Sequence, residues 1–150
     1  MTNGAAHPVS GRAPLARWTP SRAAAIAAGG AIGAGLRWLV LTQVPPGRFP
    51  WPVLAINVVG SFVLGALMAE QWAHPRRRLL LHDAAGIGFC GGLTTMSTFA
   101  VEVADLLDGG HAGTASVYVA ASVAGGLLAV VAGAAVLRRA RALMLPLEER

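Results

Sequence analysis

The sequence predicts an all-α membrane protein with four transmembrane helices, and three observations lead to this prediction. Of the 150 residues, 55% are hydrophobic and only 13% are charged, against roughly 25% charged residues in an average soluble chain. The mean hydropathy is +0.58. The apolar residues gather into four long stretches, and the arginines lie almost entirely outside them. A soluble domain of this size needs more charges on its surface, so we expect the apolar side chains to face lipid.

Each apolar stretch can reach the roughly 20 residues that a helix needs to cross the hydrocarbon core. Proline, glycine and charged residues separate the stretches at 45–48, 74–78 and 108–111. Because these breaks are short, we expect one membrane domain over residues 22–138 and no soluble module. The four helices are expected at about residues 23–41, 53–72, 79–107 and 115–137.

The positive charge comes from twelve arginines, with no lysine. Ten of them fall on one side of a four-helix topology, and two, Arg37 and Arg48, fall on the other. Arginine collects on the cytoplasmic side of membrane proteins, so we expect both termini of this cell-membrane protein in the cytoplasm. Residues 1–21 are expected to form a disordered tail and residues 139–150 a second tail. A basic groove for nucleic acid does not fit this distribution.

The third stretch is too long for a simple span, and its centre is weak as a helix. It reads GIGFCGGLTT over residues 86–95, with four glycines and two β-branched threonines. One interpretation is close helix packing, since Gly88 and Gly92 lie four residues apart. The other is a helix broken inside the membrane, where freed carbonyl groups can bind a cation. The residues alone leave both interpretations open.

Three motifs, one in each of the first three expected helices, resemble those of the Fluc (CrcB-type) fluoride channel family. Residues 29–37 read GGAIGAGLR, similar to the family's G-G-x-x-G-A-x-x-R. Residues 57–65 read NVVGSFVLG, similar to N-x-x-G-S-F-x-x-G. Residues 88–99 read GFCGGLTTMSTF, similar to G-x-C-G-G-x-T-T-F-S-T-F. The third motif is highly specific, whereas small-residue patterns like the first are common in membrane helices.

The resemblance implies a passive fluoride channel, not an enzyme, that exports the ion from the cytoplasm and lowers its toxicity. It implies an antiparallel dimer with two pores and a third helix that is broken at the membrane midplane. It also implies a structural Na⁺ at the dimer interface, which is not transported. By motif position, the backbone carbonyls of Gly91 and Thr94 would hold this ion, which would neutralise carbonyl dipoles that are costly in the membrane.

A pore for a small anion must replace water with hydrogen-bond donors and positive edges. Asn57 offers an amide, and Phe99 offers the positive edge of its ring. Tyr118 and Ser122 lie one turn apart on the fourth helix. Alternatives stay open, because Asn57 can join two helices and a hydroxyl can bond to its own helix carbonyl. The expected pore-lining residues are Asn57, Met96, Ser97, Thr98, Phe99, Tyr118 and Ser122.

Two charged residues are expected at the vestibules. Arg37 either attracts anions there or snorkels from its helix end. Glu102 lies one turn beyond Phe99, and a carboxylate at that position repels anions unless it is paired. We therefore expect Glu102 to be a polar partner near a pore mouth.

Three positions depart from the family pattern. Met96 replaces the first Phe of a pair, Val53 replaces a pore-side Thr, and Gly126 replaces a serine that would continue the row of Tyr118 and Ser122. Val53 and Gly126 each remove a donor, so we expect this subunit to line one pore poorly. A non-conducting or partly conducting subunit of a heterodimeric channel is therefore the main alternative.

The arginine bias bears on the partner in such a dimer. An antiparallel homodimer needs one sequence to insert in both orientations, which a ten-to-two bias opposes. This predicts pairing with an oppositely oriented paralogue. Without the two tails, Arg76, Arg77 and Arg78 stand against Arg37 and Arg48, and this nearly balanced core keeps the homodimer open.

Other classes of membrane protein fit the sequence less well. A small multidrug transporter also has four short helices, but it needs a carboxylate in the first helix, where this chain has only Arg37. An intramembrane enzyme needs a nucleophile and base, or a metal, at membrane depth. The four histidines instead lie in tails, loops or helix ends. A purely structural assembly subunit also remains open.

Overall fold

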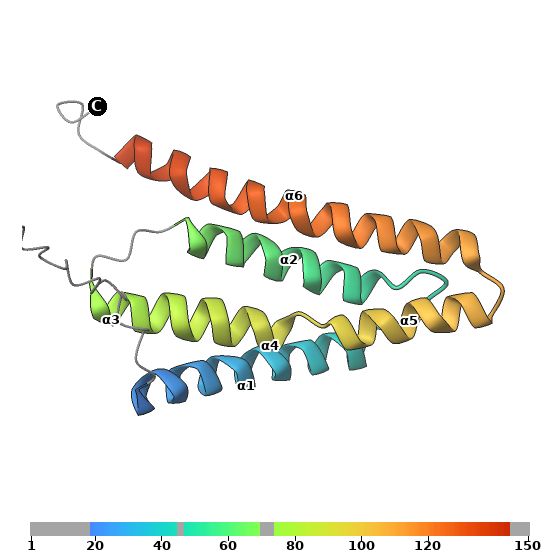
Figure 1. Ribbon diagram of the computed structural model, residues 1–150, viewed down its shortest axis with the longest axis horizontal. Coiled ribbons are helices and arrows are strands. Elements are labelled where there is room, and N and C mark those ends of the chain that lie inside the picture. Colours follow the sequence, from blue (N-terminus) through green and yellow to red (C-terminus); the bar gives the residue numbers. More distant parts are fainter. Residues whose placement is uncertain (1–18, 45–46, 70–73, 145–150) are drawn as a thin grey trace, which may run out of the picture.

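The computed structural model describes residues 19–44, 47–69 and 74–144, and these residues form helices (Figure 1). The expected tails fall largely outside the described residues. The third stretch is divided into a short helix, a π-helix (η1) and two α-helices. The elements are α1 (Pro20–Gln43), α2 (Trp51–Met68), α3 (Pro75–Arg77), η1 (Arg78–Cys90), α4 (Gly91–Leu93), α5 (Met96–Asp108) and α6 (Ala112–Met144).

Within the described residues, four helical runs are long and apolar enough to cross a membrane, namely α1, α2, the run Arg78–Asp108 and α6. The chain is therefore a multi-pass all-α membrane protein, as its composition predicts. Several ends differ from the expected bounds, and α2 ends at Met68 instead of residue 72. α1 already begins at Pro20, where the Thr19 side chain caps it. α6 continues to Met144, past the expected end at residue 137, because the arginine, alanine and leucine residues there favour a helix although they end the apolar stretch.

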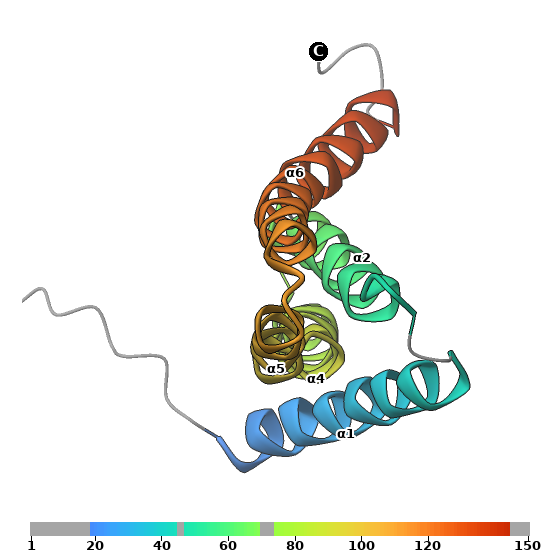
Figure 2. The same ribbon diagram turned by 90° about the vertical axis from the view of Figure 1, so that its right-hand side faces the viewer.

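Two tightly packed pairs build the fold (Figures 1 and 2). α2 packs along α6, and α1 packs along η1 and α4, whereas α1 and α2 touch little. Glycines let the backbones approach within each pair. A Cβ added at Gly33 would strike the Phe89 carbonyl, and one added at Gly65 would strike the Val130 carbonyl. Small residues at the contact are a common way for membrane helices to pack closely.

Gly88 and Gly92 belong to the same close contact with α1. A Cβ added at Gly88 would strike the Ile26 carbonyl, and one at Gly92 would strike the Gly30 carbonyl. The close-packing interpretation of these two glycines is therefore correct. The helical run is interrupted only later, at Thr94 and Thr95. The second interpretation, a break inside the membrane that binds a cation, stays a prediction.

A partly buried ion pair joins the first turn of α1 to η1, with Asp83 buried and the Arg22 side chain 24% exposed. Arg22 Nε donates to Asp83 Oδ2 at 2.7 Å, and Arg22 Nη2 donates to Asp83 Oδ1 at 3.1 Å. His82 Nδ1 lies 2.9 Å from the same Oδ1. Paired charges of this kind are what makes a carboxylate tolerable inside a membrane segment. Sequence reasoning missed this pair, although Asp83 stands out as an acidic residue within an apolar stretch.

The start of α1, α3 and the end of α6 lie at one end of the bundle (Figure 1). These elements carry Arg22, Arg76, Arg77, Arg138, Arg139 and Arg141. The end of α1 and the start of α2 lie toward the opposite end. The fold therefore places the described basic loops and helix ends on one side, as the topology requires. That this side is the cytoplasm stays a prediction.

Candidate functional site

The third span is interrupted by two extended residues between α4 and α5. Thr94 has φ −77° and ψ 155°, and Thr95 has φ −146° and ψ 123°. In a continuous helix the Thr95 N–H would bond to the Gly91 carbonyl, and the Thr98 N–H to the Thr94 carbonyl. Instead the Thr95 N–H donates to Asn57 Oδ1 and the Thr98 N–H to Thr95 Oγ1. The carbonyls of Gly91 and Thr94 are thereby released from the helical pattern.

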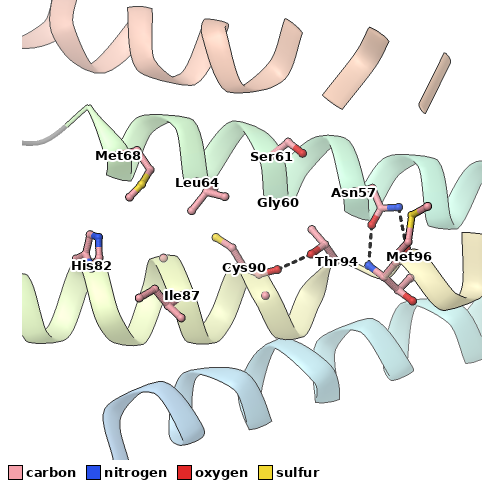
Figure 3. Close-up of a pocket in the computed structure, with 13 residues that line it drawn as sticks. Asn57, Gly60, Ser61, Leu64, Met68, His82, Ile87, Cys90, Thr94 and Met96 are labelled. Carbon is pink, nitrogen blue, oxygen red and sulfur yellow. Dashed lines mark hydrogen bonds between the residues drawn. The ribbon is translucent and has the colours of Figure 1, made fainter. Parts of the chain in front are cut away.

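Asn57, on α2, forms hydrogen bonds with the interrupted part of the third span (Figure 3). Its Oδ1 accepts from the Thr95 N–H at 2.9 Å, and its Nδ2 donates to the Thr95 carbonyl at 3.2 Å. Thr95 is only 7% exposed, so without these bonds its backbone groups would be unpaired in a nonpolar setting. Each such group costs several kcal/mol in a membrane, by order of magnitude. Asn57 thus joins two spans, and it does so at the interruption.

Arg37 reaches the same place from α1. Its Nη1 donates to the Thr94 carbonyl at 3.0 Å. The guanidinium is therefore fixed beside one of the two released carbonyls and does not extend toward the end of α1. A carbonyl oxygen has two lone pairs, so this bond leaves the Thr94 oxygen able to accept a second positive partner.

The predicted hydroxyls of the third span gather around Thr95. Thr95 Oγ1 donates to Thr98 Oγ1 at 3.0 Å and lies 3.3 Å from Ser97 Oγ. It also accepts from the Thr98 N–H and so caps the start of α5. Sequence reasoning did not single out Thr95. A threonine just before a helical segment is a recognisable capping signal, and it could have been found from that pattern.

An open pocket of about 560 Å³ lies between α2 and the run formed by η1, α4 and the start of α5 (Figure 3). It brings four predicted residues together, Asn57, Gly91, Thr94 and Met96. Met96 is 74% exposed at the first position of α5. Both released carbonyls therefore belong to residues on an open face of the chain, with Asn57 opposite them.

Phe99, Glu102 and Tyr118 form a second group between α5 and α6. The ring centroids of Phe99 and Tyr118 are 5.0 Å apart at an interplanar angle of 48°. Tyr118 is fully buried, and its hydroxyl donates to Glu102 Oε2 at 2.6 Å. Glu102 is thus paired with a hydroxyl donor. Met96 is also on α5, but it lines the open pocket and not this second group. The Phe49 ring contacts the Tyr118 ring edge-on, with ring centroids 5.6 Å apart.

Ser122 lies one turn after Tyr118 on α6. Its Oγ is buried and has no hydrogen-bond partner among the described residues. In contrast, the exposed Ser116 on the same helix donates to the Ala112 carbonyl at 2.9 Å. A buried hydroxyl without a partner costs about 1–3 kcal/mol, so Ser122 is the residue of the predicted row that the fold leaves ready to donate.

These features define a class of protein, a small four-span membrane protein with an interrupted third span and polar groups set among its helices. The sequence profile of the CrcB-like proteins, described as Camphor Resistance (CrcB), matches residues 24–134. This chain belongs to that family.

Curated relatives cover most of the chain. It is 38% identical over 121 residues to a protein of Bordetella pertussis named fluoride-specific ion channel FluC, a match that spans 81% of this chain and 94% of the relative. It is 43% identical over 124 residues to fluoride-specific ion channel FluC 1 of Mycobacterium bovis, with 79% and 91% covered. A Nocardia farcinica protein, FluC 2, is 41% identical over 119 residues. The resemblance seen in three motifs is therefore confirmed for the family.

Proposed function

We propose that this chain is a subunit of a passive, fluoride-selective ion channel that lets fluoride leave the cytoplasm. The names of the relatives support the ion, and family membership supports the channel class. Fluoride that enters as the neutral acid ionises inside the cell. A passive pore then lets the anion leave down its gradient, which lowers its toxicity.

The observation that carries the proposal is the interruption of the third span, held by Asn57 against Thr95. It sets polar backbone and an amide between helices that are mostly apolar. The Asn57 amide has a second N–H that its bond to Thr95 does not use, and the buried Ser122 hydroxyl has no partner. Both groups can donate hydrogen bonds to a small anion in place of the water molecules that it loses on entering the pore.

The same proposal includes a structural Na⁺ that is not transported, at the centre of an antiparallel dimer. The carbonyls of Gly91 and Thr94, released from helical pairing, are of the oxygen type that hard cations prefer. When bound, the ion supplies positive charge beside these carbonyl dipoles. Asn57 and Thr95 keep the carbonyls free of helix donors, and Arg37 orients one of them. Gly91 is exposed, so a second subunit can approach it.

A heterodimeric channel is the second candidate. Most arginines of the described loops and helix ends lie at one end of the bundle, which supports insertion in a single orientation. Val53, where the family pattern has a threonine, is fully buried, so that position supplies packing and no donor. These features fit a subunit that is paired with an oppositely oriented paralogue.

Fluoride efflux from liposomes that contain the purified protein tests the proposal and separates it from its rivals. A channel releases fluoride down its electrochemical gradient without coupling it to a proton or cation, once a counter-ion can leave the liposome. A multidrug transporter, an enzyme or a purely structural subunit releases none.

A further inference from the structure

At Gly126, α6 lacks the hydroxyl that would continue the row of Tyr118 and Ser122. A Cβ placed at Gly126 would meet a single neighbour within 4 Å, Ser61 Oγ, at 3.6 Å. Ser61 belongs to α2, which packs along α6. A hydroxyl therefore does lie beside position 126, but it comes from the neighbouring helix.

Ser61 occupies a favourable place on α2. It follows Asn57 by one helical turn, so the two side chains lie along neighbouring parts of one face, and both line the pocket of about 560 Å³. Figure 3 shows Ser61 at the edge of α2 toward α6, whereas Asn57 points toward Thr94. Polar groups of α2 thus lead from the interruption toward α6.

The Ser61 hydroxyl is not engaged by the protein. Thr94 and Ser116 each donate to the carbonyl four residues earlier, at 2.9 Å in both cases. Ser61 makes no such bond, and no other described residue accepts a hydrogen bond from its hydroxyl. It shares this state with Ser122, whose buried hydroxyl also lacks a partner. Serine and threonine in membrane helices commonly satisfy themselves on their own helix, so two hydroxyls without a partner on the packed helices α2 and α6 are candidates to bind a ligand.

We propose that Ser61 is a pore-lining residue that supplies the anion-binding hydroxyl missing at Gly126. The row of free hydroxyls then runs from Ser122 on α6 to Ser61 on α2, beyond Tyr118, whose hydroxyl donates to Glu102, and Gly126 leaves the space through which Ser61 reaches that row. This proposal rests on the proposed function, since it names a further fluoride contact in the same pore. It also removes one of the two reasons to expect a poorly lined pore.

The test is a rescue experiment with fluoride efflux from liposomes as the readout. Ser61→Ala should lower efflux by about 10- to 100-fold, the factor expected for one hydrogen bond to a charged group. Adding Gly126→Ser in that background should restore most of the loss, because the new side chain enters at an ordinary contact distance and brings its own hydroxyl. Adding Gly126→Ala should restore nothing, since it fills the same space without a donor.

Two controls separate a pore contact from a packing role. Ser116→Ala on α6, whose hydroxyl bonds to its own helix, should leave efflux unchanged. The ratio of fluoride to chloride efflux should fall in Ser61→Ala, which a packing role would not cause. If Ser61→Ala does not assemble, Ser61→Cys keeps the volume with only a weak donor and should show the same loss.

Equal efflux from wild-type protein and Ser61→Ala would overturn the inference and leave the proposed function intact. Equal rescue by Gly126→Ser and Gly126→Ala would also overturn it, because space and not the hydroxyl would then matter. If the wild-type protein itself releases no fluoride, the proposed function fails and this inference fails with it.

Discussion

Asn57 and Thr95 are joined by two hydrogen bonds that run in opposite directions, at 2.9 Å into Asn57 Oδ1 and 3.2 Å from Asn57 Nδ2. The amide therefore pairs with the Thr95 backbone as another peptide group would. This explains how an extended residue is tolerated between two helices in a membrane span. It also gives Asn57 a structural duty in addition to its proposed contact with the anion.

Asn57→Asp should abolish fluoride efflux. The aspartate places a negative charge where the anion must pass, and it loses the N–H that Asn57 donates to the Thr95 carbonyl. We therefore also expect a lower melting temperature, since one bond of the pair is replaced by repulsion between two oxygens. Liposome efflux and thermal unfolding in detergent check both effects. Unchanged efflux would remove Asn57 from the pore.

Gly91→Ala and Gly92→Ala should fail in different ways. A Cβ at Gly92 would strike the Gly30 carbonyl, so this variant should not assemble α1 against α4 and should express poorly. A Cβ at Gly91 meets nothing within 4 Å in the described chain. Gly91→Ala should therefore fold but lose the sodium dependence of its dimer, measured by size-exclusion chromatography in Na⁺ and in a large organic cation. A Gly91→Ala dimer whose formation depends on Na⁺ as strongly as that of the wild-type protein would contradict the assignment of this residue.

Sodium should be needed for assembly or activity without being carried. Thr94→Ser should be tolerated, because the proposed ligand is a backbone carbonyl and serine keeps the side-chain bond to the Cys90 carbonyl. The measurement is fluoride efflux after full and prolonged replacement of Na⁺, together with ²²Na⁺ uptake into the same liposomes. Activity that is indifferent to Na⁺ removal, or uptake of ²²Na⁺ with fluoride, would defeat the structural role.

Tyr118→Phe should slow fluoride efflux because it leaves Glu102 without the donor at 2.6 Å. An unpaired carboxylate beside an anion path raises the barrier, and a loss of about 10-fold corresponds to one hydrogen bond of roughly 1.4 kcal/mol. Glu102→Gln removes the charge, so combining it with Tyr118→Phe should recover part of the rate. No recovery in the double variant would show that Tyr118 acts on the ion itself and not through Glu102.

The chain should insert in one orientation when it is expressed alone. The end of the bundle that holds α3 and the end of α6 carries most of the described arginines, and such a bias fixes topology. A C-terminal reporter of membrane side should then give a signal from the cytoplasm only. Reporters on both faces, with fluoride efflux from this chain by itself, would establish a homodimer and defeat the heterodimer prediction.

The sequence predicted the four spans well because hydropathy and helix length are local properties of the chain. It predicted the region of the interruption from the glycines, but Gly88 and Gly92 turned out to pack against α1 while Thr94 and Thr95 are extended. That outcome depends on Asn57, 38 residues away along the chain. Long-range partners of this kind, including Arg22 with Asp83 and Glu102 with Tyr118, have no local signature, so the pairs themselves appear only in the folded structure.

The central claim is that this chain forms a passive, fluoride-selective pore, and one measurement tests it most directly. Purified protein is reconstituted into liposomes loaded with equal concentrations of potassium fluoride and potassium chloride, and ion-selective electrodes follow both anions after valinomycin is added. The account predicts rapid fluoride efflux with chloride retained, for this chain alone or with its oppositely oriented partner. Fluoride retained in both preparations, or chloride released as fast as fluoride, would contradict it.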